Sequence, residues 1–196
     1  MKSEKFRLIL ASNSPRRKEL LAGLGLPFEV RVLKGVDESF PADLPVSEVA
    51  RYIAEKKADA YQQTMGNDEL VITADTVVIV GNEILGKPVD EADAIRMLRL
   101  LSGKTHQVTT GVCLLTTAQK HAFDVTTDVT FKVLNDEEIH YYVTHYKPFD
   151  KAGAYGIQEW IGYIGVTCLH GSYYNVMGLP VQRIYNELLQ LNLIKK

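Results

Sequence analysis

The sequence predicts an α/β fold in which helices flank a mixed β-sheet. An apolar, extended segment at residues 6–12 runs into a helical pattern at residues 15–25, which is typical of a strand followed by a helix. Residues 106–117 and 121–133 are rich in Val and Thr and predict an antiparallel hairpin. A strand–helix unit and a hairpin in one chain together indicate a mixed sheet.

The other elements follow from the spacing of apolar residues and from helix caps. The β-branched run at residues 70–80 is the strongest strand pattern and is expected to be buried on both faces. Ser102-Gly103 is a typical end for a helix at 91–101, and Asn135 caps a helix with an acidic first turn. The patterns also predict a strand at 28–33, a polar loop at 35–45, an amphipathic helix at 46–61, a short strand or loop at 84–88, a loop at 147–158, a strand at 163–170 and a closing helix at 179–191.

Length and composition favour an ordinary globular protein. The 196 residues predict a single domain over 1–196, and a net charge of −2 gives no overall attraction to nucleic acid or acidic membranes, so neither is an expected partner. Residues 1–7 lack the apolar core of a secretory signal, and no apolar run approaches the length of a membrane span. We therefore expect a cytoplasmic protein. Cys113 and Cys168 both lie in apolar runs and are expected to be buried, reduced thiols.

The first helix begins with an electrostatic conflict. Ser14-Pro15 predicts an N-cap followed by proline at the first helical position. Arg16 and Arg17 then occupy the first turn, where the partial positive charge of the helix disfavours cations. A bound anion would remove the conflict, and a Ser-rich turn with two guanidinium groups suits a polyphosphate.

Four further residues are candidates for chemistry. Asp75 interrupts the β-branched run, so it is either a structural aspartate hydrogen-bonded to a loop, or a general base or ligand of a hard cation. Singly, Glu38 is explained as a solvated loop residue and Lys57 as a lysine that extends to solvent beside an apolar stripe. Lys87 lies in a short segment from which its ammonium could enter a cleft. Together, two carboxylates and two lysines suit metal-assisted attack of water on a phosphate ester.

Other chemistries are disfavoured by the sequence. Gly103-Lys104-Thr105 matches the end of a Walker A loop, but Leu98 stands where its first glycine belongs and the segment follows a helix. The five histidines include no H-E-x-x-H pair, which argues against a zinc site.

Motifs along nearly the whole chain resemble those of the Maf proteins, also called septum formation inhibitor homologues. They run from about residue 8 to residue 181. In order, they are Ser12-x-Ser14-Pro15-Arg16-Arg17 with Glu19-Leu20-Leu21, Asp37-Glu38, Glu55-Lys56-Lys57-Ala58, Ala74-Asp75-Thr76-Val77-Val78, Leu85-Gly86-Lys87-Pro88, Ser102-Gly103-x-Thr105-His106, Asp150-Lys151-Ala152-Gly153-x-Tyr155-Gly156-Ile157-Gln158 and Gly171-Ser172-x-x-Asn175-Val176-x-Gly178-Leu179-Pro180.

The resemblance implies a nucleoside triphosphate pyrophosphatase, which releases a nucleoside monophosphate and pyrophosphate. It also implies the fold of inosine triphosphatases, an elongated mixed sheet flanked by helices, with two lobes and a deep cleft. Mg²⁺ or Mn²⁺ is the implied cofactor, and a homodimer is the implied assembly. By resemblance, Asp75 is the proton acceptor, Glu38, Lys57 and Lys87 complete the catalytic set, Glu38 and Asp75 hold metal, and Ser12, Ser14 and Arg17 bind phosphate. Lys56 adjoins Lys57, so either lysine could fill that position.

Three positions bear on the substrate. Arg16, Thr76 and Gln158 resemble the branch of the family that acts on dTTP and UTP rather than the branch that prefers 7-methyl-GTP. A glutamine amide has both the donor and the acceptor that the imide edge of thymine or uracil requires. The alternatives are a pyrophosphatase for 7-methyl-GTP or another modified purine, and a nucleotide- or DNA-binding regulator of cell division without turnover. A binder of anions has no need for two carboxylates near phosphate, which favours the enzyme.

Overall fold

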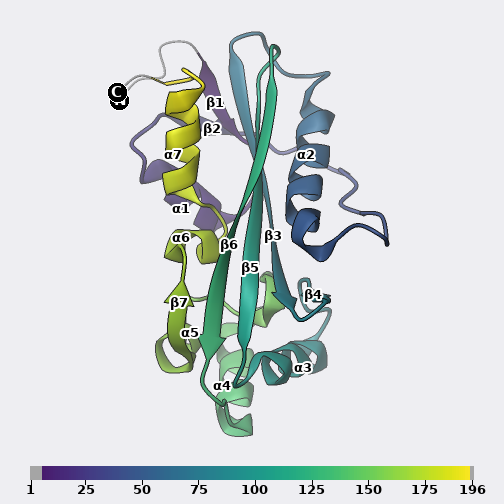
Figure 1. Ribbon diagram of the computed structural model, residues 1–196, viewed down its shortest axis with the longest axis vertical. Coiled ribbons are helices and arrows are strands. Elements are labelled where there is room, and N and C mark those ends of the chain that lie inside the picture. Colours follow the sequence, from purple (N-terminus) through teal and green to yellow (C-terminus); the bar gives the residue numbers. More distant parts are fainter. Residues whose placement is uncertain (1–5, 195–196) are drawn as a thin grey trace. The chain divides into compact units, whose positions relative to one another are not determined.

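The computed structural model describes residues 6–194 (Figure 1). The strands are β1 (Arg7–Leu10), β2 (Phe28–Val30), β3 (Glu69–Val80), β4 (Glu83–Leu85), β5 (Thr105–Leu115), β6 (Lys120–Phe131) and β7 (Val166–His170). The helices are α1 (Pro15–Ala22), α2 (Val49–Tyr61), α3 (Glu91–Leu101), α4 (Asp136–Tyr146), α5 (Trp160–Gly165), α6 (Tyr173–Met177) and α7 (Val181–Gln190), with 3₁₀ turns at Val46–Glu48 and Ala152–Ala154.

Within residues 6–194, seven strands form one mixed sheet. The order is β2-β1-β3-β5-β6-β7, and β4 pairs with β3. Strand β1 is parallel to β2 and β3, whereas β4 is antiparallel to β3 and β7 is antiparallel to β6. The predicted α/β class with a mixed sheet flanked by helices is therefore confirmed.

The chain divides into two compact units. The first unit contains the described residues up to Asp75, Thr110–Val125, and the residues from Gly178 onward; the second contains Thr76–Thr109 and Thr126–Met177. Strands β3, β5 and β6 contribute residues to both units.

In the first unit, α2 packs its apolar face on the sheet. Apolar side chains spaced three and four residues apart along α2 produce this face, as the sequence predicts. Gly111 on β5 allows the close approach, because an added Cβ would lie 2.3 Å from the backbone of Ala50. The buried cluster consists of Ile9, Ala54, Ala58, Tyr61, Val71, Cys113 and Leu115.

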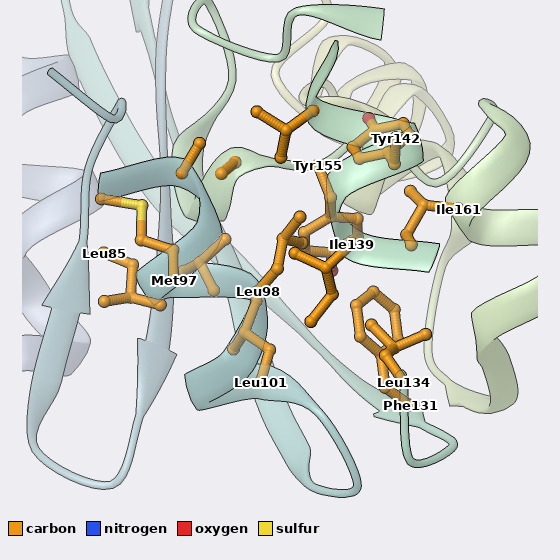
Figure 2. Close-up of a cluster of buried hydrophobic side chains, with 14 of the residues drawn as sticks. Leu85, Met97, Leu98, Leu101, Phe131, Leu134, Ile139, Tyr142, Tyr155 and Ile161 are labelled. Carbon is orange, nitrogen blue, oxygen red and sulfur yellow. The ribbon is translucent and has the colours of Figure 1, made fainter. Parts of the chain in front are cut away.

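In the second unit, α3 and α4 cover a separate apolar cluster (Figure 2). In this cluster, Leu98 and Leu101 of α3 pack with Ile139 and Tyr142 of α4. All four side chains are almost inaccessible to solvent. Helix α3 begins and ends at the predicted residues. Helix α4 has the predicted cap at Asn135, completed as a capping box by the third helical residue.

Two short helices, α5 and α6, differ from the sequence prediction. The sequence predicted a strand at 163–170, but α5 occupies Trp160–Gly165 and β7 begins only at Val166. An added Cβ at Gly162 would lie 1.8 Å from the Ile157 carbonyl oxygen, so the glycine permits a close backbone approach inside a helical turn. In α6, the Ser172 hydroxyl accepts a hydrogen bond from the Asn175 N–H, and the buried Asn175 side chain donates to Val108 O and Thr127 Oγ1. These tertiary contacts are absent from local sequence patterns.

The prediction of two buried thiols is right for Cys113 and wrong for Cys168. Both are free thiols, but Cys168 is exposed. Cys168 lies on β7, the last strand in the sheet order, where it is paired with Thr130 of β6. An edge strand has a neighbour on one side only, so an apolar run there does not guarantee burial. No helix of residues 6–194 is long and apolar enough to cross a membrane.

A buried carboxylate at the start of β3 joins side chains from the β1–β2 edge of the sheet in the first unit. The Glu69 side chain is 3% exposed and accepts hydrogen bonds of 2.7 Å from both Arg7 and Arg31. Hydrogen bonds from Arg31 are the main cause that lowers the pKa of Glu69 to about 2. Because the folded protein holds this carboxylate charged, its ion pairs contribute stability above the unfolded pKa near 4.5.

We predict that Glu69→Gln lowers the free energy of unfolding by about 3 kcal/mol at neutral pH, because it leaves two arginines without their buried partner. As the pH falls from 4.5 towards 2, the unfolded state gains a proton that the folded state excludes, so wild-type stability declines and the difference between the two proteins narrows. Urea unfolding across this pH range measures both effects. Glu29→Gln, which removes an exposed carboxylate from the same cluster, is the control and should change little. A Glu69→Gln deficit that stays constant with pH would contradict the assignment.

Candidate active site

The ammonium of Lys57 lies between two carboxylates in the first unit. Its Nζ is 2.7 Å from Asp75 Oδ1 and 3.0 Å from Glu38 Oε1. The Lys57 and Asp75 side chains are 14% and 15% exposed, whereas Glu38 is 57% exposed. The structure therefore brings together three of the four residues predicted to be catalytic, with solvent access on the Glu38 side.

Strand β3 and helix α2 fix the buried half of this arrangement. Thr73 and Asp75 are two residues apart on β3, so their side chains lie on the same face of the strand. The Thr73 hydroxyl donates to Ala54 O at 2.6 Å, and Lys57, three residues after Ala54 on α2, reaches Asp75. The polar residues that interrupt the β-branched run are thus the ones that attach β3 to α2.

Lys56 has a different set of partners. Its ammonium donates to Asp37 Oδ2 at 2.6 Å and to Ser39 O at 2.9 Å, in the loop that carries Glu38. Hydrogen bonding from Lys56 is the main cause that lowers the pKa of Asp37 far below its ordinary value. Of the two neighbouring lysines, Lys57 contacts Asp75 and Glu38, and Lys56 holds the loop on either side of Glu38.

The start of α1 has the predicted cap. The Ser14 side chain accepts a hydrogen bond from the Arg17 N–H, and Pro15 is the first helical residue. The buried Ser12 hydroxyl in turn accepts a hydrogen bond from the Ser14 N–H at 3.2 Å. Both serines that were predicted to bind phosphate therefore shape the turn that leads into α1, where Arg16 occupies the first helical turn.

Arg17 binds main-chain carbonyl groups. Its Nε donates to Gly178 O and its Nη1 donates to Ala74 O, both at 2.8 Å. Burial is the main influence on Arg17 and lowers the pKa of its guanidinium, against the opposing charges of Asp75 and Glu38. Because Ala74 directly precedes Asp75, Arg17 fixes α1 beside the strand segment that carries the candidate proton acceptor.

The remaining predicted residues belong to the second unit. Thr76 follows Asp75 directly on β3 and is half-buried. Lys87 is exposed in the segment after β4, where the Gly86 carbonyl accepts a 3.0 Å hydrogen bond from the Gly153 N–H. Gln158 is half-buried, and its Oε1 is a buried acceptor that has no hydrogen-bond partner among the described residues.

A network that sequence reasoning missed lies beside Gln158. The buried Lys151 ammonium is 3.0 Å from Glu159 Oε1, and the Tyr142 hydroxyl donates to Glu159 Oε2. Lysine is rarely buried without a partner, and Lys151 lies in a segment of small and apolar residues. That placement was the available signal for a buried ion pair.

The donor set fits a hard divalent cation. In enzymes that act on phosphates, Mg²⁺ is usually held by one or two carboxylates, with water and substrate phosphates as the other ligands. Glu38 and Asp75 supply two such carboxylates, both within 3.0 Å of Lys57 Nζ. No group of three or more His, Cys, Asp or Glu suited to a metal occurs within residues 6–194, so a cation here would depend on ligands from the substrate.

The sequence matches a protein family and several known proteins over nearly its whole length. The Maf-like protein family matches residues 7–191, a range that includes all the candidate residues above. The chain belongs to this family. A dTTP/UTP pyrophosphatase of Phocaeicola vulgatus is 60% identical over 188 residues, covering 96% of this chain and 97% of that protein. A dTTP/UTP pyrophosphatase of Bacteroides thetaiotaomicron is 58% identical over the same length.

The Ham1 protein of Staphylococcus aureus has a similar fold. Its structure aligns with a TM-score of 0.51 at 16% sequence identity and covers 95% of this chain and 99% of that one. At this identity the likeness concerns the fold alone. The Maf resemblance found in the sequence motifs is thus confirmed by the family match, and the inosine triphosphatase-like fold is confirmed by the Ham1 structure.

We predict that Arg17→Lys lowers the free energy of unfolding by about 1–2 kcal/mol, because an ammonium cannot reproduce the planar geometry that reaches both carbonyls. Urea unfolding at constant pH measures the change. Arg99→Lys is the matched control: Arg99 donates through Nε to the exposed Asp136, and its replacement should change little. Equal stability of Arg17→Lys and wild type would show that the two carbonyl contacts do not hold α1.

Proposed function

We propose that this protein hydrolyses dTTP and UTP to the nucleoside monophosphate and pyrophosphate. The observation that carries the proposal is the Lys57 ammonium held between Asp75 and Glu38. A nucleotide-binding protein without turnover has no use for two carboxylates near phosphate, whereas hydrolysis needs a proton acceptor and groups that neutralise developing charge. The names of relatives that are 55–60% identical supply the reaction and the substrates.

In this proposal, Asp75 accepts the proton of the attacking water. Lys57 positions Asp75 through their 2.7 Å ion pair, and its ammonium offsets the negative charge that develops on the phosphate. A bound Mg²⁺ or Mn²⁺, held by Glu38 and Asp75, would polarise the phosphate and neutralise its charge. Lys87 adds a second ammonium to the phosphate groups.

The turn before α1 receives the polyphosphate. Ser12 and Ser14 present hydroxyl groups there, and the N-terminus of α1 favours negative charge. Arg17 contributes positive charge while its Nε and Nη1 stay bound to carbonyls. Arg16 lies in the same helical turn and, in this proposal, acts in the choice of base.

The family resemblance assigns Gln158, like Arg16 and Thr76, to the choice of base. Gln158 Oε1 has no hydrogen-bond partner within residues 6–194, which supports this role, because a buried acceptor without a donor costs about 1–3 kcal/mol and a ligand N–H would remove that cost. Thymine and uracil carry such an N–H at N3. Pyrimidines modified at carbon 5 keep the same imide edge, so we propose that their triphosphates are also substrates and that the enzyme clears them from the nucleotide pool.

The first test is a nucleotide panel with the purified chain and Mg²⁺. We expect release of monophosphate and pyrophosphate from dTTP and UTP, with kcat/KM values above that for 7-methyl-GTP. Asp75→Asn should lower kcat by about 10³-fold, because the amide cannot accept the proton. Asp59 is an exposed aspartate of α2 that forms an ion pair with Lys120. Asp59→Asn is therefore the matched control and should keep wild-type activity. Faster turnover of 7-methyl-GTP than of dTTP would reject the substrate assignment, and normal activity of Asp75→Asn would reject the role of Asp75.

The second test concerns the metal. We expect EDTA to abolish turnover and added Mg²⁺ or Mn²⁺ to restore it. Glu38→Gln should raise the metal concentration needed for half-maximal activity by about tenfold, because it removes one of two anionic ligands. Asp59→Asn again serves as control, with an unchanged metal requirement. Full activity in EDTA would show that hydrolysis here proceeds without a dissociable cation.

A further inference from the structure

The loop that carries Glu38 is attached to the rest of the first unit through α2. The side chains of Asp37 and Glu38 are both more than half exposed, so burial does not fix this part of the chain. Within residues 6–194, the hydrogen bonds and ion pairs of residues 37–39 with other elements all go to two lysines of α2. Lys57 pairs with the Glu38 carboxylate, and Lys56 contacts Asp37 and Ser39. The position of Glu38 therefore depends on these two lysines.

A cavity beside the loop shows that packing does not take over this task. The cavity, of about 430 Å³, lies between the chain segment 33–37 and α2, where Lys56 and Ala60 line it. The segment before Glu38 is therefore not closely packed on α2 along this stretch, and the ammonium of Lys56 supplies the attachment.

Lys56 holds the loop on both sides of Glu38. Its Nζ donates to Asp37 Oδ2 at 2.6 Å, to Ser39 O at 2.9 Å and to Ser39 Oγ at 3.2 Å. The Asp37 carboxylate also accepts hydrogen bonds from the Ser39 N–H and hydroxyl, which closes the turn around Glu38. A cation bound to Glu38 would compete with Lys57 for the carboxylate oxygens, whereas the contacts of Lys56 do not involve that carboxylate. Lys56 can therefore hold the loop while a cation is bound.

We propose that Lys56 is a positioning residue that holds Glu38 where its carboxylate can bind the divalent cation of the reaction together with Asp75. This inference rests on the proposed function, which assigns Glu38 and Asp75 to the cation. The charge of Lys56 has the opposite effect, because a positive charge beside the loop disfavours a second cation there. Positioning and charge therefore predict changes of opposite sign when the ammonium is removed.

Lys56→Met removes the ammonium and keeps most of the length of the side chain. Mn²⁺ binding is measured by electron paramagnetic resonance in the presence of a UTP analogue that has an imido bridge between its α- and β-phosphates and so resists hydrolysis. We expect Lys56→Met to weaken Mn²⁺ binding by about fivefold, the equivalent of one hydrogen bond. Lys120→Met is the matched control, because it removes a lysine that forms a 2.8 Å ion pair with Asp59 of α2, and it should leave Mn²⁺ binding unchanged.

The same substitution in a Glu38→Gln protein shows whether Lys56 acts through Glu38. We expect Lys56→Met to cause no further weakening there, because the carboxylate that it positions is already lost. A merely structural role of Lys56 would weaken Mn²⁺ binding by the same factor with and without Glu38.

The outcomes separate this inference from the proposed function. Unchanged or tighter Mn²⁺ binding in Lys56→Met, or an equal loss in the two backgrounds, would overturn the role of Lys56, and hydrolysis of dTTP and UTP by the wild type would leave the proposed function standing. A wild-type protein that hydrolyses neither nucleotide rejects the proposed function. Mn²⁺ titration without nucleotide then tests the inference alone: weaker binding by Lys56→Met supports it, and equal binding, tighter binding or no binding by the wild type overturns it.

Discussion

The site in the first unit depends on the pairing of Asp75 with Lys57. Asp75 belongs to a strand whose neighbouring residues are nearly all buried, and a carboxylate in such a strand is stable only with a partner of opposite charge. Lys57 supplies that partner at 2.7 Å. The requirement also fixes α2, because the helix must present Lys57 to Asp75 and Ala54 O to Thr73 at once.

The two arginines of α1 show how one observation can have two causes. Their position in the first helical turn conflicts with the helix dipole, and a bound anion is a sufficient explanation. Arg17 has a further one, because its guanidinium donates to the carbonyl oxygens of Ala74 and Gly178. The dipole penalty is a fraction of a kcal/mol to about 1 kcal/mol, and two charge-assisted hydrogen bonds exceed it. The anion is therefore not needed to explain Arg17, and the phosphate role of this turn stays a prediction that rests on the family.

Local sequence signals predicted the elements whose determinants are local. Helix α3 has its own N-cap at Asp90 and its own stop at Ser102-Gly103, and α4 has a capping box, so both were predicted closely. Helices α5 and α6 were missed because their determinants are a close approach to the Ile157 carbonyl and the anchoring of Asn175 by distant residues. The same division holds for the candidate site. Asp75 was detectable as a charge in an apolar strand, but its pairing with Lys57 rather than Lys56 needs the packing of α2 on β3.

The two units position their candidate residues by different means. Asp75 and Lys57 stand on a strand and a helix that ordinary packing already holds rigid, so few additional contacts are required. Gln158 follows a 3₁₀ turn in an irregular segment that cannot rely on a regular hydrogen-bond ladder. The buried Lys151–Glu159–Tyr142 network supplies the missing rigidity, at the desolvation cost of an ion pair.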